Sequence, residues 1–441
     1  MRLAAPSVLP PLSGLDARDA GEAFVPRGIS TFEEAGLETA LLEGLVLKFL
    51  FNTGQSSGRR IAAELGLPFG PFPEYLRQLK NAQILTYANT VTAGDFVYSL
   101  TDVGRARARS YLDECSYVGT APVPFDDYLD SVAAQTIVNE HPKEDDLRRA
   151  FEDLLISEQT FGMLGPAINS GRGLFLYGFP GNGKTSIAER ITLCFGTSVW
   201  IPRVLCIEGQ LVKLFDPANH EEMPRRSAGG LLDSSDYDRR WVHIKRPTIV
   251  AGGELRMEDL EIRFDPITKL SEAPLQLKSN LGSFLIDDFG RQRMQPVELL
   301  NRWIVPLEKR YDFLSLANGK KVRVPFDQLI IFSTNLEPRQ LVDEAFLRRI
   351  PYKIHAVDPT EAEFRQMIHI FAPRLGFEAV DADAVDYLIN AHYRRAKRPF
   401  RCCQPRDLLL QVRNYCVYND LPLVMKPEYF DFAVKNYFTV M

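Results

Sequence analysis

The stretch GLFLYGFPGNGKT, Gly173 to Thr185, joins a short apolar run to the pattern G-x-x-x-x-G-K-T. Glycines in such a pattern let successive backbone N–H groups turn toward one anion, an approach that Cβ atoms would obstruct. The run SIAERITLCF that follows has apolar residues at helical spacing, so the positive end of its helix dipole would face the same anion. A strand, a glycine-rich loop and a helix in this order predict a phosphate-binding loop.

The residues of this loop have predicted tasks in binding a nucleotide. Lys184 would bring a positive charge to the outer phosphates, and the Thr185 hydroxyl is a suitable ligand for Mg²⁺. The backbone of the whole segment would surround the phosphate oxygens. The residues predicted to bind the nucleotide are Gly178, Phe179, Pro180, Gly181, Asn182, Gly183, Lys184, Thr185 and Ser186.

A second stretch, SFLIDDFGRQ from Ser283 to Gln292, ends an apolar run in two adjacent acids, Asp287 and Asp288. Two like charges at the end of a buried strand are costly unless something uses them. Asp287 is suited to the Mg²⁺ shell opposite Thr185, since Mg²⁺ prefers oxygen ligands. Asp288 would then lie near the attacking water and polarise it. The alternative is a solvated pair at a strand end, and the phosphate-binding loop favours the functional interpretation.

Composition and charge exclude several classes of protein. The formal charge of −5, from 52 Lys and Arg against 57 Asp and Glu, argues against a generally basic nucleic-acid coat. The six cysteines have no metal-ligand spacing, so we expect reduced thiols and a cytoplasmic protein. Prolines interrupt the first residues, which makes a poor signal peptide, and no uncharged apolar run of about 18 residues predicts a membrane helix.

The segment 36–112 has its own pattern, three helical stretches followed by alternating residues around Ala93-Gly94-Asp95. Three helices and a β-hairpin in this order resemble a winged helix-turn-helix domain. Residues 31–112 carry eight basic and eight acidic side chains, so their net charge is zero, whereas a protein that reads a DNA groove normally has a basic surface. Two interpretations stay open: DNA binding through residues 31–112, or docking of another protein or subunit.

Strand-like apolar runs alternate with helical ones through the middle of the chain, and the last part is helical throughout. The alternation is typical of an α/β fold with a doubly wound parallel sheet, here a P-loop nucleotide-binding core followed by a helical C-terminal lid. The predicted domains are a flexible tail (1–30), a winged helix-turn-helix domain (31–115), a linker (116–144), the P-loop core (145–357) and the helical lid (358–441).

Three more stretches follow the acid pair. An apolar run ends near Asn335, the pair Arg348-Arg349 precedes another apolar run, and Arg406 follows a proline in a helical segment. The stretches read LIIFSTNL, VDEAFLRRIPYKI and QPRDLLLQV. Together with the phosphate-binding loop and the acid pair, they make residues 145–441 resemble the AAA+ ATPase superfamily, with the motifs in that family's order.

The resemblance implies that the ligand is ATP, that the metal is Mg²⁺ and that the activity is ATP hydrolysis. Besides Lys184 and Asp288, it implies a catalytic role for Asn335, which would hydrogen-bond the attacking water or the terminal phosphate. Arg406 would link the lid to the same phosphate, so that the lid position depends on the nucleotide.

The arginine pair implies an assembly. In such a family Arg349 or Arg348 would reach into the site of the next subunit, where a guanidinium stabilises charge on the transferring phosphoryl group better than Lys does. We prefer Arg349, because it directly precedes the apolar run IPYKI. The resemblance therefore suggests a homo-oligomer, a hexameric ring.

Two regions predict insertions into the core. The stretch YDFLSLANGKKVRVPFDQLIIF alternates around Asn318-Gly319, which predicts a type I′ hairpin. A hairpin there resembles the pre-sensor-1 insert of the MoxR-like and enhancer-type branch of the superfamily. The segment between Gly196 and Leu281 is long and contains two possible hairpins, at 203–216 and at 248–264.

The sequence departs from the family pattern in two places. Asp288 stands where the family usually has Glu, and its shorter side chain requires the water to be held about one methylene closer, so turnover could be slow. The stretch TSVWIP, expected to be the second core strand, offers only Thr197 and Ser198 as the polar switch residue of that strand.

The predicted function is Mg²⁺-dependent ATP hydrolysis by an oligomer that remodels a protein or protein–nucleic-acid partner, with no membrane involved and with a client that the sequence does not name. The alternative is an ATP-gated DNA-binding regulator whose output is the winged helix. The basic run HYRRAKRPFR, residues 392–401, either binds nucleic acid or belongs to a lid surface that faces the nucleotide or a neighbouring subunit.

Overall fold

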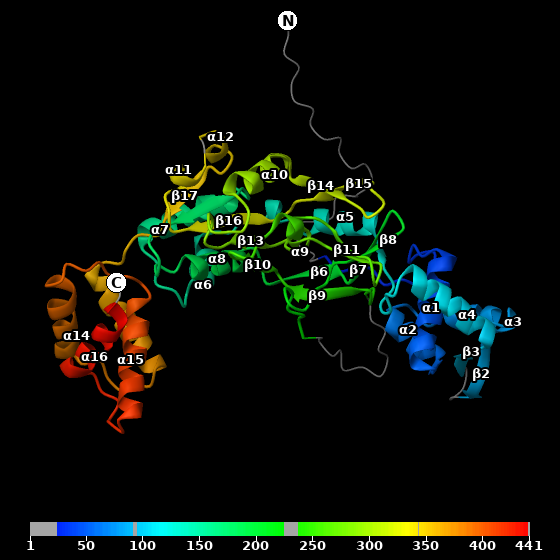
Figure 1. Cartoon of the computed structure of the whole chain (residues 1–441), viewed down its shortest axis with the longest axis horizontal. Coiled ribbons are helices and arrows are strands. Elements are labelled where there is room, and N and C mark those ends of the chain that lie inside the picture. The colour runs from blue at the N-terminus through cyan, green and yellow to red at the C-terminus, as the bar shows by residue number, and fades with distance from the viewer. Residues whose placement is uncertain (1–23, 91–94, 225–236, 343, 440–441) are drawn as a thin grey trace, which may run out of the picture.

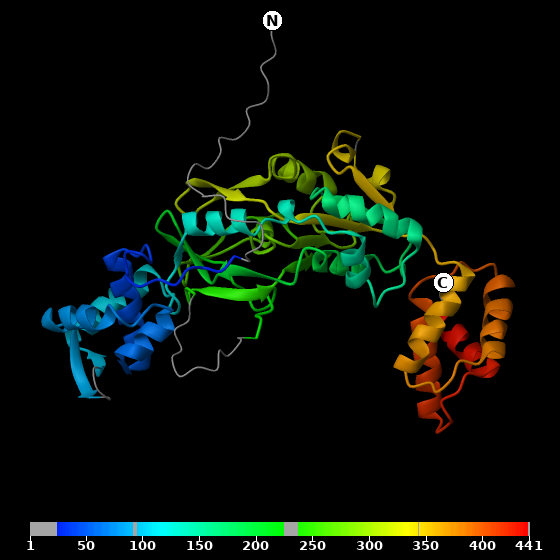
Figure 2. The same cartoon turned by 180° about the vertical axis from the view of Figure 1, so that it is seen from behind.

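The computed structural model describes residues 24–90, 95–224, 237–342 and 344–439. Along its long axis lie a small N-terminal domain, a central α/β body and a helical C-terminal domain (Figure 1). Seen from behind, both end domains project to the same side of the central body (Figure 2). The fold class is α/β, as the sequence predicts.

The N-terminal domain contains the helices and the hairpin predicted for residues 36–112. Its elements are α1 (Thr39–Thr53), β1 (Gln55–Ser57), α2 (Gly58–Leu65), α3 (Phe72–Asn81), β2 (Leu85–Thr90), β3 (Phe96–Leu100) and α4 (Asp102–Glu114). The strands form an antiparallel sheet in the order β1-β3-β2. Asp95 fastens this sheet to α2 by accepting a hydrogen bond from the backbone N–H of Gly58 at 3.0 Å. The predicted turn at residues 93–95 lies mostly outside the described residues.

A five-stranded parallel sheet forms the centre of the body. Its strands, in spatial order, are β10 (Thr248–Ala251), β13 (Ser283–Ile286), β16 (Leu329–Thr334), β5 (Leu174–Tyr177) and β17 (Tyr352–His355). One face is covered by α6 (Glu144–Ala150), α7 (Glu158–Asn169) and α8 (Lys184–Leu193), and the other by α10 (Pro296–Lys309). Leu174 and Leu176 pack on the first face and Phe175 on the second, which confirms a doubly wound sheet.

A second β-unit is built largely from the long insertion between α8 and β13. Strands β6 (Ser198–Pro202) and β9 (Trp241–Lys245) pair as an antiparallel ribbon. A separate five-stranded sheet has the order β11-β12-β8-β7-β4. Its strands are β4 (Val123–Pro124), β7 (Val204–Ile207), β8 (Gln210–Lys213), β11 (Arg263–Asp265) and β12 (Leu270–Glu272). The hairpin predicted within 203–216 is present as β7 and β8.

The segment 116–144, predicted to be a linker, is structured. It supplies β4, the helix α5 (Phe125–Ala134) and a short 3-10 turn, η1 (Ile137–Asn139). Tyr128 and Val132 of α5 are buried in the same core as Val199 and Val242 of the ribbon. The partners of these side chains come from the insertion more than 60 residues later, so the local pattern of 116–144 does not reveal the burial.

The second strand of the core differs from the prediction. The stretch TSVWIP forms β6 of the separate ribbon, and the core strand beside β13 is β10, which the sequence placed in a hairpin at 248–264. After β10 come a 3-10 turn, η2 (Met257–Leu260), and β11. Both TSVWIP and TIVA are short and rich in β-branched residues, so only the pairing with β13 distinguishes the core strand.

The hairpin before β16 is present, with a different turn from the one predicted. Strands β14 (Tyr311–Ser315) and β15 (Lys321–Pro325) pair antiparallel. Gly319 has φ 81°, whereas Asn318 is not in the left-handed region that a type I′ turn requires. The Gly319 N–H donates to the Leu316 carbonyl at 2.9 Å. A longer loop with one left-handed glycine therefore closes the hairpin.

The C-terminal domain is helical, as predicted. Its elements are α13 (Glu361–Arg374), α14 (Ala382–Tyr387), a π-helical segment η3 (Leu388–Arg394), α15 (Gln404–Tyr418) and α16 (Pro427–Phe438). Thr360 and Glu363 form a reciprocal capping box at the start of α13. The buried Tyr393 of η3 donates its hydroxyl hydrogen bond to Gln404 Oε1 at 3.0 Å, which joins η3 to α15.

A buried ion pair joins the N-terminal domain to the second β-unit. Arg240 is 1% exposed and Asp238 is 4% exposed. The Arg240 guanidinium donates to both carboxylate oxygens of Asp238 and, through Nη1, to the carbonyls of Ala35 at 2.7 Å and Pro122 at 2.8 Å. One side chain thus holds three separate chain segments together.

The described end of the predicted flexible tail also packs on this unit. Residues 1–23 lie outside the described residues. Arg27 forms a β-bridge with Tyr237, and the Phe24 ring lies 5.9 Å from the Trp241 ring, centroid to centroid. The ordered domain therefore begins before residue 31.

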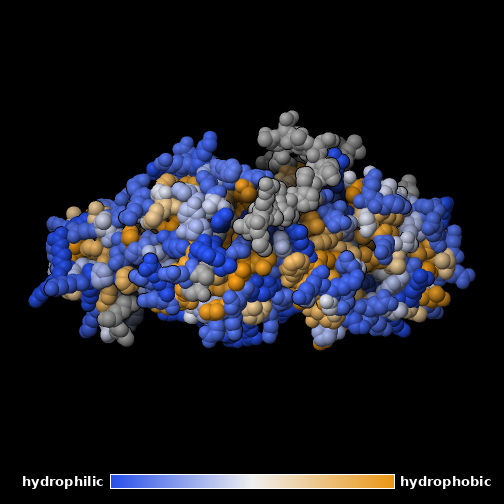
Figure 3. Space-filling view, turned by 90° about the horizontal axis from the view of Figure 1, so that it is seen from above, coloured by the Kyte–Doolittle hydropathy of each residue, from blue (hydrophilic) through white to orange (hydrophobic). Residues whose placement is uncertain are grey.

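The face of the molecule seen from above is mostly polar. Seen from above, hydrophilic side chains cover most of the visible face, and apolar ones gather in small areas between them (Figure 3). Within the described residues, we find no helix with the length and apolar character needed to span a bilayer. All six cysteines are free thiols, as predicted.

We expect Arg240→Ala to destabilise the protein strongly. The substitution leaves the Asp238 carboxylate buried without its cation, which costs roughly 3–5 kcal/mol at such a site. Thermal unfolding followed by circular dichroism would show a lower midpoint. Arg263→Ala is the matched control, because that side chain is 68% exposed and its removal should change stability by less than about 0.5 kcal/mol. Equal midpoints for the two variants would contradict the role given to Arg240.

Candidate nucleotide site

The strand order brings three polar strand ends to one edge of the central sheet. Because the strands are parallel, the loop after β5, the acids after β13 and the residue after β16 all lie at the carboxyl edge. Strand β16 lies between β5 and β13, so Asn335 stands between Lys184 and Asp288. The residues predicted from separate stretches of sequence therefore meet.

Asn335 connects the phosphate-binding loop to the acid pair. Its Oδ1 accepts a hydrogen bond from Lys184 Nζ at 2.7 Å, and its Nδ2 donates to Asp288 Oδ1 at 3.0 Å. The cation selects the amide oxygen and the carboxylate selects the NH₂ group, so the two partners fix the amide orientation. Lys184 also donates to the carbonyls of Gly178 at 3.0 Å and Phe179 at 3.1 Å.

The ammonium of Lys184 is electrostatically tuned by its surroundings. Burial lowers its pKa from the ordinary value for lysine. Asp287 and Asp288 act in the opposite direction and favour the charged form, whereas Arg401 lowers the pKa further. Lys184 is 7% exposed, so a negative group that replaced its carbonyl partners would interact with it in a poorly solvated place.

Thr185 and Asp287 form the part of the site that fits a metal. The Thr185 hydroxyl, in the first turn of α8, donates to Asp287 Oδ2 at 2.8 Å. A hydroxyl and a carboxylate that face each other are the oxygen donors that Mg²⁺ accepts alongside phosphate and water. The donor set therefore fits the predicted metal.

The backbone of the loop suits a phosphate group. Gly183 has φ 74°, and a Cβ built at this position would meet no atom within 4 Å. The first turn of α8 follows directly, and the N–H groups of a first helical turn have no acceptor within their own helix. Free N–H groups, open space and a helix dipole at one point are the elements of an anion site.

The two acids are the first residues of a tight turn after β13. Asp288 has φ 49°, in the left-handed region, and its side chain is exposed, whereas Asp287 is half-buried. The backbone N–H of Asp288 donates to Asp287 Oδ1 at 3.0 Å. The turn directs the Asp287 carboxylate to Thr185 and the Asp288 carboxylate to Asn335. Each of the two adjacent negative charges therefore has its own hydrogen-bond donor.

Gln292, for which the sequence predicted no role, stabilises this turn. Its Nε2 donates to the carbonyl of Asp287 at 2.8 Å and to that of Asp288 at 3.3 Å, and its Oε1 accepts from the Gly290 N–H at 2.8 Å. One amide therefore holds three main-chain groups of the segment that carries the acids. The only signal in the sequence is a polar residue shortly after DDFG, which is common in loops.

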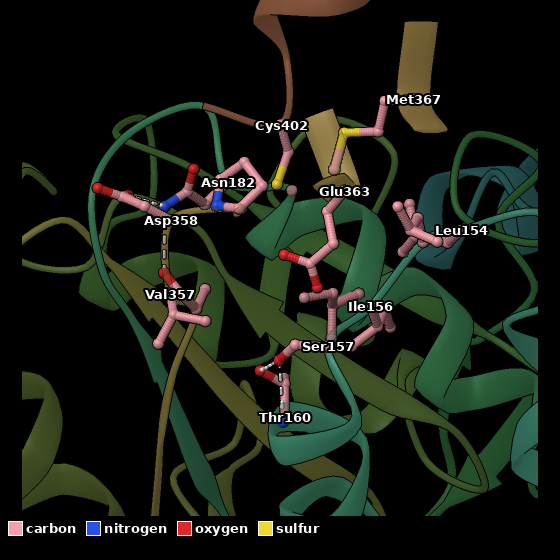
Figure 4. A pocket seen from close by; sticks show the side chains of 15 residues that line it. Leu154, Ile156, Ser157, Thr160, Asn182, Val357, Asp358, Glu363, Met367 and Cys402 are labelled. Atoms are coloured by element: carbon pink, nitrogen blue, oxygen red, sulfur yellow. Dashed lines mark hydrogen bonds between the residues drawn. The ribbon is translucent and has the colours of Figure 1, made fainter. Parts of the chain in front are cut away.

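A cavity lies beside the phosphate-binding loop, and the sequence did not predict it. It is lined mostly by apolar side chains from the segment before α7, from α8, from the connection after β17 and from α13 (Figure 4). The apolar lining includes Leu154, Ile156, Ile187, Val357 and Met367. Asn182 and Gly183 of the loop border the same space, so a ligand with phosphates on the loop would have an apolar recess beside it.

The three arginines predicted to act on the phosphate lie in different settings. Arg349 Nε donates to Glu308 Oε1 of α10 at 2.6 Å, and Arg348 is exposed. The two follow the short helices α11 (Pro338–Leu341) and α12 (Glu344–Leu347). The side chain of Arg406 is 59% exposed and pairs with Asp407 at 3.0 Å. The contacts found for Arg349 and Arg406 thus do not involve the loop.

Arg401 is the cation of the C-terminal domain that lies at the loop. Its guanidinium carbon is 4.2 Å from the centroid of the Phe179 ring. With Arg401 in place, the Phe179 residue at the loop tip is still 55% exposed. Arg401 is the last residue of the basic run 392–401, so one of the two interpretations of that run, a surface facing the nucleotide, fits this residue.

Comparison with known proteins gives few matches in sequence. Residues 360–436, in the C-terminal helical domain, match a family model described as "Domain of unknown function (DUF8689)". No curated protein matches the chain.

Solved structures give distant likenesses. NtrX from Brucella abortus in complex with ATP is 14% identical, with a TM-score of 0.39, and the match covers 66% of this chain and 59% of that chain. This chain therefore spans less than two thirds of the length of NtrX. The Thermotoga maritima RuvB Holliday junction branch migration motor is 13% identical, with a TM-score of 0.37, and the match covers 67% of this chain and 70% of that chain.

For the ATP hydrolysis that the sequence predicts, we expect Gln292→Ala to slow phosphate release by about tenfold or more without weakening nucleotide binding, because a displaced acid pair loses its alignment whereas the loop stays intact. The measurements are steady-state phosphate release and titration with a fluorescent ATP analogue. Gln295→Ala is the control, since that side chain makes no capping hydrogen bond at the start of α10. Parallel losses in both variants, or an unchanged rate in Gln292→Ala, would contradict the positioning role.

Proposed function

We propose that this protein is a Mg²⁺-dependent ATPase of the AAA+ superfamily. The observation that carries the proposal is the connected set Lys184–Asn335–Asp288, with the pair Thr185–Asp287 beside it, at the carboxyl edge of a parallel sheet. A structural loop would need the glycines and the helix start, but it would not need an amide that joins the loop lysine to a carboxylate two strands away. The hairpin β14–β15 directly before β16 supports the predicted pre-sensor-1 branch.

The residues of the site divide the work of phosphoryl transfer. Lys184 would exchange its carbonyl partners for the outer phosphates, and Thr185 and Asp287 would hold Mg²⁺, which when bound would neutralise charge on the phosphates. Asn335 keeps its bond to Asp288 and aligns the attacking water or the terminal phosphate. Asp288 accepts a proton from that water as it attacks. With Asp in place of the usual Glu, we propose slow turnover.

The assembly is part of the proposal. Arg349 is engaged with Glu308 of its own chain, whereas Arg348 is exposed next to it, so Arg348 is the better placed of the two to enter the site of a neighbouring copy. This reverses the preference drawn from the sequence. We propose a homo-oligomer, a hexameric ring as the family resemblance suggests, in which each site is completed by the neighbour.

The N-terminal domain is proposed to dock a protein client or another subunit. On α3, the helix that would enter a DNA groove, Arg77 pairs with Glu74. Residues 31–112 carry no net charge, so they lack the electrostatic attraction that supplies most non-specific DNA affinity. The charge balance thus favours protein remodelling over the DNA-gated alternative.

We expect Asp288→Asn to bind ATP with near wild-type affinity and to release phosphate at least about a hundredfold more slowly, because the amide cannot accept the proton. Lys184→Ala should lose ATP binding itself, since it removes the cation for the outer phosphates. A fluorescent ATP analogue and a phosphate-release assay separate the two effects. Chelation of Mg²⁺ should abolish the wild-type rate. If Asp288→Asn turns over as fast as the wild type, the role given to Asp288 is wrong.

We expect Arg348→Ala and Lys184→Ala, each inactive alone, to regain activity when mixed. In a mixed assembly an Arg348→Ala subunit keeps its own loop, and its Lys184→Ala neighbour supplies the missing arginine. Phosphate release from the mixture should exceed the sum of the separate rates. Arg339→Ala, which removes another exposed arginine close by on α11, should remain active alone. A mixture with no gain would contradict a shared site.

A further inference from the structure

The connection between β17 and α13 leads from the central body to the C-terminal domain, and it carries one carboxylate, Asp358, at the edge of the candidate nucleotide site (Figure 4). The neighbouring Ala356, Val357 and Pro359 line the cavity together with Asp358. Asp358 was not singled out in the sequence, where Asp-Pro simply marks the end of a strand-like run.

On one side, Asp358 is bonded to the phosphate-binding loop. Asn182 Nδ2 donates to Asp358 Oδ1 at 2.7 Å and to the Ala356 carbonyl at 3.2 Å. Asn182 is 4% exposed, so these bonds lie in a poorly solvated place. Both hydrogens of the NH₂ group have acceptors, which fixes the amide orientation and couples the position of the loop to the carboxylate.

On the other side, Asp358 is bonded to the C-terminal domain. Arg401 Nη1 donates to the same oxygen, Asp358 Oδ1, in an ion pair whose side chains are 16% and 33% exposed respectively. The guanidinium of Arg401 also lies over the Phe179 ring, and the backbone N–H of Cys403 donates to the Gly181 carbonyl at 2.9 Å. The segment that leads into α15 thus touches the loop at its tip and at its middle.

One oxygen atom therefore accepts from the loop and from the C-terminal domain at once. A change in the loop that moves Asn182 alters the environment of the carboxylate that Arg401 binds, and the converse is equally true. Coupling between two contacts is reciprocal. A bond that favours contact between the C-terminal domain and the loop must therefore also favour the loop geometry present in that contact.

We propose that Asp358 is a positioning residue that latches the C-terminal helical domain onto the phosphate-binding loop, and that it thereby raises the affinity of the site for ATP. This role rests on the proposed nucleotide site. It differs from the role that the family resemblance implies for Arg406. The cation that contacts the loop here is Arg401, and the group that joins it to the loop is the carboxylate of Asp358, in the connection between β17 and α13.

The test compares Asp358→Ala and the isosteric Asp358→Asn with Glu361→Gln. Glu361 is the matched control, because its carboxylate also accepts from two arginines, Arg365 and Arg394, but both belong to the C-terminal domain. Titration of the full chain with a fluorescent ATP analogue should give a dissociation constant raised about tenfold for both Asp358 variants. The control should bind like the wild type, and thermal midpoints verify that all variants fold.

A second readout needs no nucleotide. Backbone amide exchange at residues 400–404 should be faster in Asp358→Ala than in the wild type, because the contacts that the segment before α15 makes with the loop open more often. Faster exchange there and an equal rate in the middle of α16 would support the latch. Unchanged exchange at 400–404 would overturn it, whatever the nucleotide results.

Combining Asp358→Ala with Arg401→Ala completes the test. If the two residues act through one bond, the double variant should lose no more affinity than the more affected single variant. Additive losses would overturn the latch and assign the two residues independent roles. If the wild-type chain binds no ATP analogue, the proposed function is wrong. That result would not bear on the contact between Asp358 and Arg401, which the exchange measurement tests separately.

Discussion

The position of β16 between β5 and β13 is the constraint on which the site depends. In a parallel sheet with any other order, the loop lysine and the acid pair would not be joined by the residue at the end of a single strand. Here the amide of Asn335 reaches both, at 2.7 Å to Lys184 and at 3.0 Å to Asp288. The apolar alternation of β5 holds helices on both faces, so the sheet that carries these groups is rigid at the place where they meet.

The insertions are tied to the helix that follows the acid pair. Arg302 of α10 donates to Asp312 of β14 at 2.6 Å and to Glu261, just after η2, at 3.0 Å. Its side chain is 18% exposed, so these ion pairs are only partly screened by water. A displacement of α10 would therefore move both the β14–β15 hairpin and the segment before β11. The same helix holds Arg349 through Glu308, which links the acid pair to the chain segment that would face a neighbouring subunit.

Sequence patterns predicted the parts of the site whose chemistry is local. The loop and the acids are recognisable because glycine, lysine, threonine and aspartate must follow a strand in a fixed order. The sequence prediction misplaced strand β10 and did not include helix α5 or the contacts of Asp358. Each of these depends on partners far away in the chain. The contact between Arg406 and phosphate, which the family resemblance implies, stays a prediction: in the structure its side chain pairs with Asp407, and Arg401 is a cation that lies at the loop. Burial and pairing across segments decide such questions, and no local pattern records them.

The acid pair is best understood as a matched set with Asn335. The left-handed backbone of Asp288, held by Gln292, directs its short side chain to the Asn335 amide at hydrogen-bond distance. A glutamate at this position would extend about one methylene further and would have to displace Asn335 or turn away from it. Asn335 in turn engages Lys184, so a longer acid would disturb the phosphate-binding loop as well. Aspartate therefore keeps the loop, the amide and the acid in one connected network.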